Sequence, residues 1–206
     1  MSRRRHFSMI RDFQVADILT LGNGFAGTGA ILATLAYVVH RDDFYMKVAF
    51  WLLPVALVCD FLDGRVARLR HECSPLGQEL DSLADLVSFG VAPAVLAFAL
   101  GMRGLWDALV LIYFVGCGIS RLARYNATAA SLSDDSGKVR YFEGTPIPTS
   151  LFVCLVFLIL FALGRVGAAL PFGVVRVGPW DLHPIVLLYA ISGSAMVSKT
   201  LHIPKP

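Results

Sequence analysis

Residues 60–85 read DFLDGRVARLRHECSPLGQELDSLAD, which places four aspartates in an otherwise apolar part of the chain. Asp60 and Asp63 are three residues apart, and Asp81 and Asp85 are four apart. Both spacings put two carboxylates on the same face of a helix. A polar segment that ends in a Ser-Pro dipeptide separates the two pairs and predicts a turn. The stretch therefore predicts a helical hairpin whose four carboxylates point toward one small volume.

Four carboxylates in one small volume repel one another unless cations lie between them. Hard divalent cations take carboxylate oxygens as ligands, so Mg²⁺ or Mn²⁺ is expected here. Paired metal ions also stabilise the entering and leaving oxygens of a phosphoryl group. A salt-bridged helix pair is disfavoured, because only Arg65 and Arg68 accompany the four aspartates. We therefore expect two metal ions, held by Asp60, Asp63, Asp81 and Asp85.

The composition is that of an integral membrane protein. The 206 residues are 56% hydrophobic and only 16% charged, with a mean hydropathy of +0.67. Several apolar runs approach the roughly 20 residues that a membrane-spanning helix needs, and no clustered basic and aromatic face suggests nucleic-acid binding. The sequence predicts one all-α membrane domain, residues 1–206, with six spans at about 16–39, 44–68, 77–100, 105–126, 147–165 and 184–200.

The distribution of positive charge predicts the orientation. Six spans place both termini on one side, and most of the 18 Lys and Arg residues fall on that side. The positive-inside rule then places the termini and the aspartate hairpin in the cytoplasm, whether the membrane is a bacterial or archaeal inner membrane or the endoplasmic reticulum. Phe7, Ile10 and Phe13 recur at helical spacing among N-terminal arginines. Residues 1–14 are expected to form an interfacial helix, with a solvated basic tail as the alternative.

The order Asp-x-x-Asp-Gly-x-x-Ala-Arg, eight residues, then Gly-x-x-x-Asp-x-x-x-Asp is complete between Asp60 and Asp85. It resembles the signature of the CDP-alcohol phosphatidyltransferases. The resemblance implies a six-helix membrane domain, usually found as a homodimer. It also implies that the four aspartates arrange the metal ions and that Asp85 is the base for the acceptor hydroxyl.

The cytidine diphosphate part of the substrate has its own candidate residues. Small residues leave room where a ligand approaches a helix backbone, and an arginine can hold phosphate through several donors. Asn23, in the first predicted span, is either a ligand contact or a packing hydrogen bond. Together with the resemblance, these arguments give the nucleotide set Asn23, Asp63, Gly64, Ala67, Arg68 and Gly77.

The later motifs resemble the serine-accepting branch of that family. They are RLARYN at 121–126, YFEGTPIP at 141–148 and MVSK at 196–199. Arg121 and Arg124 share a helix face and are suited to binding a carboxylate, and Glu143 is suited to an ammonium group. The candidate acceptor residues are Arg121, Arg124, Asn126 and Glu143. The arginines are alternatively interfacial anchors.

The expected reaction joins CDP-diacylglycerol and L-serine to give phosphatidylserine and CMP. The enzyme is expected to work while surrounded by membrane lipids. Inositol phosphate or glycerol phosphate is the alternative acceptor, because either would also bind arginines. A divalent-cation transporter is an alternative from another class, but it would need carboxylates at several depths. A membrane scaffold without activity is the remaining alternative, and the complete motif argues against it.

Overall fold

The computed structural model describes residues 15–70, 75–131, 141–198 and 202–204. The predicted N-terminal interfacial helix lies outside these residues. The helices are α2 (Val15–His40), α3 (Asp43–Arg70), α4 (Pro75–Asp85), α5 (Ala92–Ala99), α6 (Leu105–Ser131), α7 (Ser150–Ala162) and α8 (Leu187–Val197). The short helical turns are the π-turn η1 (Leu86–Val91) and the 3₁₀ turns η2 (Ile147–Thr149), η3 (Gly167–Ala169) and η4 (Pro184–Val186). The strands are β1 (Tyr141–Glu143), β2 (Val175–Val177), β3 (Trp180–Leu182) and β4 (His202–Pro204).

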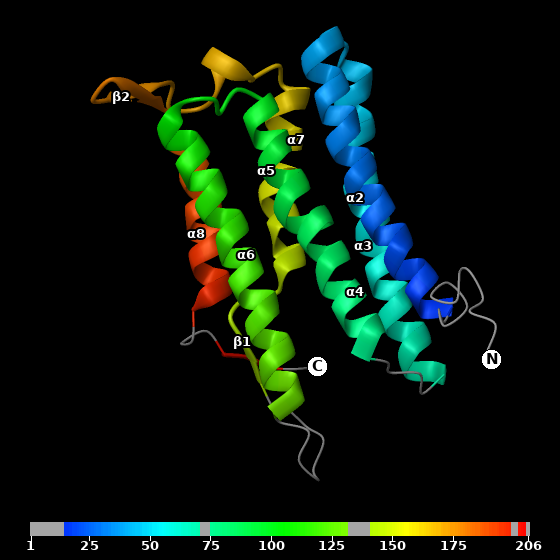
Figure 1. Cartoon of the computed structure of the whole chain (residues 1–206). Coiled ribbons are helices and arrows are strands. Elements are labelled where there is room, and N and C mark those ends of the chain that lie inside the picture. Colours follow the sequence, from blue (N-terminus) through cyan, green and yellow to red (C-terminus); the bar gives the residue numbers. More distant parts are fainter. Residues whose placement is uncertain (1–14, 71–74, 132–140, 199–201, 205–206) are drawn as a thin grey trace, which may run out of the picture.

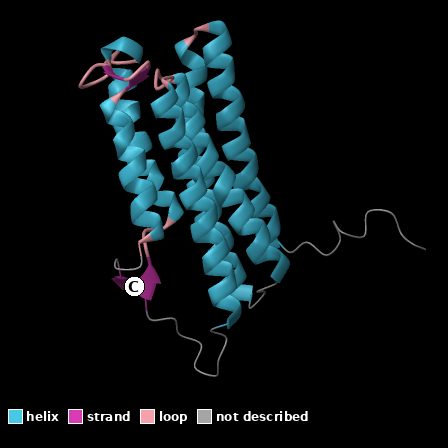
Figure 2. Cartoon of the chain, turned by 60° about the vertical axis from the view of Figure 1, so that its left-hand side comes forward, coloured by secondary structure: helices cyan, strands magenta, loops and turns pink. Residues whose placement is uncertain are grey.

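The helices lie side by side in one bundle (Figure 1). Segments α4, η1 and α5 follow one another without a break, so they act as one long rod. We call the end where α2 begins and α3 ends the carboxylate end, and the opposite end the far end. Two short antiparallel strand pairs mark the two ends (Figure 2). β1 pairs with β4 at the carboxylate end, and β2 pairs with β3 at the far end.

Four segments are long and apolar enough to cross a membrane: Ala16–His40, Asp43–Leu69, Leu76–Ala99 and Leu105–Ala127. Residues Ile147–Ala162 and Pro184–Val197 form shorter apolar helices. The protein is therefore a helical integral membrane protein, and the count of six spans stays a prediction.

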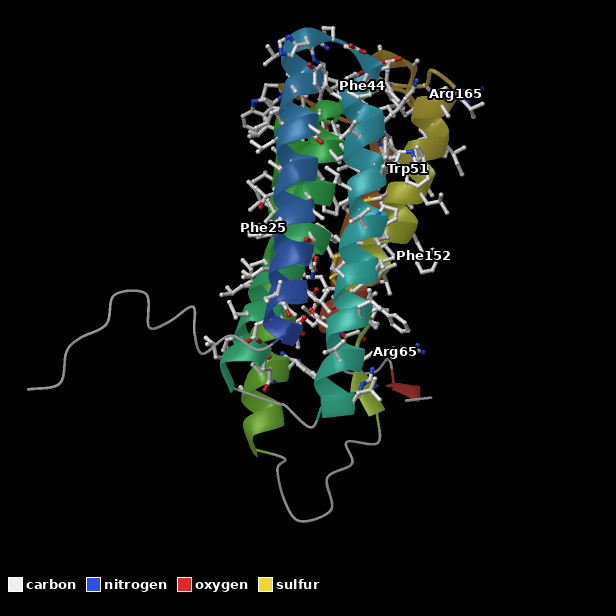
Figure 3. All side chains as sticks on the ribbon, turned by 90° about the vertical axis from the view of Figure 1, so that its right-hand side faces the viewer. Phe25, Phe44, Trp51, Arg65, Phe152 and Arg165 are labelled. Carbon is white, nitrogen blue, oxygen red and sulfur yellow. The ribbon has the colours of Figure 1, made fainter. Side chains whose placement is uncertain are left out.

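Large apolar side chains cover the outside of the bundle. Phe25, Trp51 and Phe152 are each more than 70% exposed, and they point away from the helices in Figure 3. Arg65 and Arg165 lie toward opposite ends of this apolar belt (Figure 3). Such a surface matches lipid rather than water, because a solvated monomer rarely exposes so large a contiguous apolar area.

The core is packed around aromatic side chains from three helices. Tyr189 of α8 is fully buried, stacks on Phe157 of α7 at 5.7 Å between ring centroids, and meets Phe114 of α6 edge to face at 5.0 Å. Its hydroxyl donates to the Pro93 carbonyl at 3.0 Å. The phenol therefore joins the second half of the chain to the rod that carries two of the aspartates.

A π-turn follows Asp85 directly. Ser88 in this turn donates to the Asn23 carbonyl at 2.9 Å, and Ser150 donates to the Phe89 carbonyl at 2.7 Å. Gly27 of α2 faces Ser88 so closely that an added Cβ would lie 2.7 Å from the Ser88 Cα. Turns of this kind are often found at functional sites, and this one is held from both sides by buried hydroxyls.

Residues 166–181, which the sequence suggests are a Gly/Pro loop, contain a strand pair. Gly178 and Pro179 make the tight turn between β2 and β3, with Gly178 at φ +66°. Only glycine reaches that conformation without cost. The short strands have no alternating pattern long enough to reveal them in the sequence.

Candidate functional site

Three carboxylates converge at the carboxylate end. Asp60 and Asp63 come from α3 and Asp81 from α4, and one oxygen of each lies within 4.8 Å of the others. The spacing of three residues puts Asp60 and Asp63 on one face of α3. Asp81 reaches them from α4, which packs against α2, as α3 does. Asp63 is buried, and the other two are partly buried.

Asp85 lies beside these three residues, one helical turn after Asp81. Its carboxyl is within hydrogen-bonding reach of Asp60, and it accepts a 3.0 Å hydrogen bond from the Asn23 amide. Asp85 is only 8% exposed. The structure therefore places it next to the three clustered carboxylates, with its orientation fixed by a residue of α2.

The beginning of α2 supplies further polar groups. The buried Thr20 hydroxyl lies 2.7 Å from an Asp63 oxygen and 3.1 Å from the Ala16 carbonyl, and its single proton can be donated to Asp63, a candidate metal ligand. Asp17, only 3% exposed, lies close enough to Asp63 to interact electrostatically. Sequence reasoning missed Asp17. Its position three residues before Thr20, in an apolar run, was the available signal.

The donor set fits a divalent cation. One buried oxygen of Asp81 and the side-chain oxygen of Asn23 have no hydrogen-bond partner. Among the described residues, no arginine or lysine forms an ion pair with any of the clustered aspartates. Converging carboxylates without compensating cations are costly inside a membrane bundle. Hard oxygen ligands in this number are suited to Mg²⁺ or Mn²⁺.

Space for a ligand lies along the next turn of α3. A Cβ built on Gly64 would meet only the Arg68 guanidinium, at 3.9 Å, and Ala67 is partly exposed. Arg68 donates its Nε to the Gly64 carbonyl at 2.9 Å, which holds its exposed guanidinium along this surface. Gly77 lies in the first turn of α4 and is partly exposed. Arg65 instead packs over the Phe61 ring at 4.4 Å and points outward (Figure 3).

Arg121 is a candidate acceptor residue that approaches the aspartates. It lies close enough to Asp85 and Tyr125 for electrostatic interaction, and its buried Nε has no hydrogen-bond partner. Arg124 is exposed and makes no hydrogen bond or ion pair within the described residues. Glu143 belongs to β1, opposite His202 of β4, and its side chain lies outside what the structure describes.

Asn126 is the centre of a hydrogen-bond network between α6 and α4. Its side-chain oxygen accepts from Ser82 at 3.2 Å and from Gln78 at 3.5 Å, and its amide donates to Glu79 at 3.3 Å. Sequence reasoning missed these three partners, although they are polar residues next to a predicted metal ligand. This hydrogen-bond network holds the last third of α6 against the helix that carries Asp81.

An apolar groove lies between α3 and α7. It has a volume of about 310 Å³, and its lining includes Phe50, Leu53 and Leu57 of α3 and Leu151, Leu155 and Leu158 of α7. Residues 50, 53, 57, 60 and 64 follow alternating steps of three and four, so they share one face of α3. The groove therefore ends about one helical turn from Asp60.

Comparison with known proteins gives consistent matches. The family model described as CDP-alcohol phosphatidyltransferase matches residues 13–190. A CDP-diacylglycerol–serine O-phosphatidyltransferase of Saccharomyces cerevisiae is 47% identical over 208 residues, covering 100% of this chain and 75% of the yeast protein. A protein of the same name from Bacillus subtilis is 34% identical over 158 residues, covering 73% and 81%. One from Mycobacterium tuberculosis is 40% identical over 126 residues, covering 58% and 42%.

Proposed function

The chain belongs to the CDP-alcohol phosphatidyltransferase family, and from this premise we propose that it transfers the phosphatidyl group of CDP-diacylglycerol to the hydroxyl of L-serine. The products are phosphatidylserine and CMP. The observation that carries the proposal is the convergence of Asp60, Asp63 and Asp81 beside an oriented Asp85. The yeast and bacterial relatives carry the name of this activity.

Asp85 takes the proton from the serine hydroxyl. The resulting oxygen attacks the lipid-proximal phosphorus and forms the new P–O bond, while the P–O bond to the CMP phosphate breaks and CMP leaves with the electron pair. Asp85 then releases the proton to water. Asn23 supports this role, because its amide holds one Asp85 oxygen and thereby sets the direction of the other.

Divalent cations would be held by Asp60, Asp63 and Asp81, with Asp85 at the margin. When bound, they supply positive charge that polarises the diphosphate and stabilises the leaving phosphate. Thr20 orients Asp63 by its 2.7 Å hydrogen bond. Such an outer partner fixes the direction of a ligand and commonly changes metal affinity by about 10- to 100-fold.

The nucleotide would lie over Gly64 and Ala67, where the helix surface is open. Gly77, partly exposed on α4, is the remaining candidate contact. Arg68 would bind a phosphate oxygen with the donors that remain after its Nε has bonded to Gly64. Asp63 borders both the metal and the nucleotide positions. The acyl chains would lie in the groove between α3 and α7, because it is apolar and continues along the face of α3 that carries Asp60.

Serine would approach from α6. Arg121 supports this placement, because it lies near Asp85 with a buried donor still unpaired, and a serine carboxylate would satisfy that donor. Asn126 would shape this side of the site through its bonds to Ser82 and Glu79. Arg124 and Glu143 remain candidates for the outer part of the acceptor site. Inositol phosphate and glycerol phosphate are the alternative acceptors.

The proposal includes an orientation. The carboxylate end would face the cytoplasm, where serine and CMP are dissolved, and six helices would cross the membrane with two copies paired as a homodimer. The gathering of all four aspartates at one end supports an enzyme rather than a cation pathway through the membrane.

A comparison of the three candidate acceptors tests the proposal. Purified protein in CDP-diacylglycerol micelles is given Mn²⁺ and one of serine, inositol phosphate or glycerol phosphate, and CMP release is measured. Of the three acceptors, only serine should yield both CMP and a phosphatidylated product, which is phosphatidylserine. Chelation of the cation should stop the reaction. Release of CMP with inositol phosphate but not with serine would reject the acceptor. Transport of Mn²⁺ into liposomes without any CMP would reject the enzyme.

A further inference from the structure

The strand pair at the far end carries an apolar surface that the proposed reaction does not use. We define the far-end hairpin as residues 172–182, which include β2 and β3. In Figure 1 it projects sideways from the bundle at the level where α6 begins. We propose that the far-end hairpin is a membrane anchor that lies in the interfacial layer of the leaflet opposite the carboxylate end.

The exposed side chains of the far-end hairpin are mostly apolar. Phe172 is 81% exposed, and Trp180, Val174, Val175 and Val177 are each more than 40% exposed. Exposing five large apolar groups in eleven residues to water would raise the free energy of the hairpin. Tryptophan and other aromatic rings are enriched at the boundary between lipid and water, where the ring is buried and its polar edge stays wet.

The far-end hairpin is attached firmly to the bundle. Trp106, in the first turn of α6, donates its indole N–H to the Val177 carbonyl at 3.0 Å and meets the Trp180 ring edge to face at 6.1 Å. His183 follows β3 directly, and its backbone N–H donates to the fully buried Asp107 of α6 at 2.8 Å. Nδ1 of His183 lies 2.6 Å from the same carboxylate. The apolar side chains are therefore held at a fixed height relative to α6.

That height coincides with the edge of the lipid-facing belt. Leu105, Leu109 and Ile112 are exposed along the first two turns of α6, which also carry Trp106, the residue that holds the hairpin. The apolar surface of the hairpin thus continues the surface that α6 presents to lipid. A leaflet that covers one covers the other, which favours lipid over a separate protein partner.

The charges of the hairpin fit the same location. The Arg176 side chain is 80% exposed, and its only ion pair within the described residues is a 3.9 Å contact to Asp181. An exposed pair of this length contributes little. The guanidinium is therefore free to bind lipid phosphate while the neighbouring Val175 and Val177 reach the acyl region.

The three tryptophans of the chain allow a direct test. Trp106 and Trp180 report on the hairpin, and Trp51 lies on the lipid-facing side of α3, roughly 12 Å from its start at 1.5 Å per residue. Full-length W51F protein, and a W106F/W180F double variant as the deep reference, are placed in phosphatidylcholine vesicles. The lipids are brominated either near the head group or near the end of the acyl chain, and fluorescence quenching is measured.

The hairpin tryptophans of W51F should be quenched about twofold more by the shallow bromines than by the deep ones, and Trp51 should show the opposite order. F172N in the W51F background should reduce the shallow quenching, since asparagine tolerates the φ of +69° at this position but removes the apolar ring. F172L should retain it. Efficient quenching of W51F by aqueous acrylamide alone would overturn the proposal, and so would protection from both kinds of quencher, which would mean that a second protein surface covers the hairpin.

Discussion

Asn23 on α2 donates a 3.0 Å hydrogen bond from Nδ2 to Oδ1 of Asp85, 62 residues later in the chain. The same asparagine accepts a 2.9 Å bond from Ser88 at its backbone carbonyl, so α2 contacts the aspartate-bearing rod both at Asp85 and within the π-turn that follows it. Asp85 therefore takes its direction from a different helix than the one that carries it. This arrangement makes Asn23 a positioning residue for the proposed base.

Asp85→Asn should abolish most turnover while leaving nucleotide binding nearly intact. The amide keeps the size of the side chain but cannot take the serine proton, and a general base contributes about 10²- to 10⁴-fold in rate. The measurements are CMP release and the affinity for CMP. Asp43→Asn, at an exposed acid in the first turn of α3 at the far end, is the matched control. Turnover near the wild-type rate in D85N would remove Asp85 from the role of base.

Asn23→Ala distinguishes the two roles that the sequence left open for this residue. If Asn23 positions Asp85, kcat falls about tenfold, which corresponds to the loss of one buried hydrogen bond, while the KM for CDP-diacylglycerol changes little. If Asn23 instead contacts the nucleotide, that KM rises and kcat is less affected. Thr34→Ala is the control, because it removes a hydrogen bond to Ala30 within the same helix, well away from the site.

The aspartate hairpin was the most readable feature of the sequence because its geometry is local. Spacings of three and four residues determine which carboxylates share a helix face, and the described helices α3 and α4 do bring Asp60, Asp63 and Asp81 together. Long apolar runs likewise predicted helices close to their observed limits. The sequence places a span at 105–126, and α6 covers Leu105–Ser131.

Features that depend on contacts between distant residues could not be predicted in this way. The π-turn at 86–91 has no sequence signature, and its hydrogen bond from Ser150 joins residues 61 positions apart. The pairing of Asp107 with His183 spans 76 positions. The strands β2 and β3 are three residues each, too short for alternation to separate them from a loop. In each case the tertiary packing, and not the local pattern, selects the structure.

Arg121→Ala should raise the KM for serine about 10- to 100-fold, because a hydrogen bond from a charged donor to a carboxylate contributes about 1.5–3 kcal/mol. Arg124→Ala should change it by about threefold or less, since Arg124 is exposed and the effect of such a charge is small. Steady-state kinetics with varied serine measure both. Equal effects of the two substitutions would contradict the placement of serine beside Arg121 and favour interfacial anchoring of both arginines.

Gly27→Ala should destabilise the protein by about 1–3 kcal/mol, as overpacking does in a dense interior. The new methyl group would lie 2.7 Å from the Ser88 Cα, so α2 and the π-turn would have to separate, and the bonds from Ser88 to Asn23 and from Asn23 to Asp85 would lengthen. Gly116→Ala is the matched control, because a Cβ there meets nothing within 4 Å. This substitution also removes a flexible residue from the interior of α6. The control should be neutral or stabilising by about 0.4–1 kcal/mol. Thermal unfolding in detergent, followed by tryptophan fluorescence, measures both variants. A Tm of G27A at or above that of G116A would show that the α2 crossing is not as tight as the structure has it.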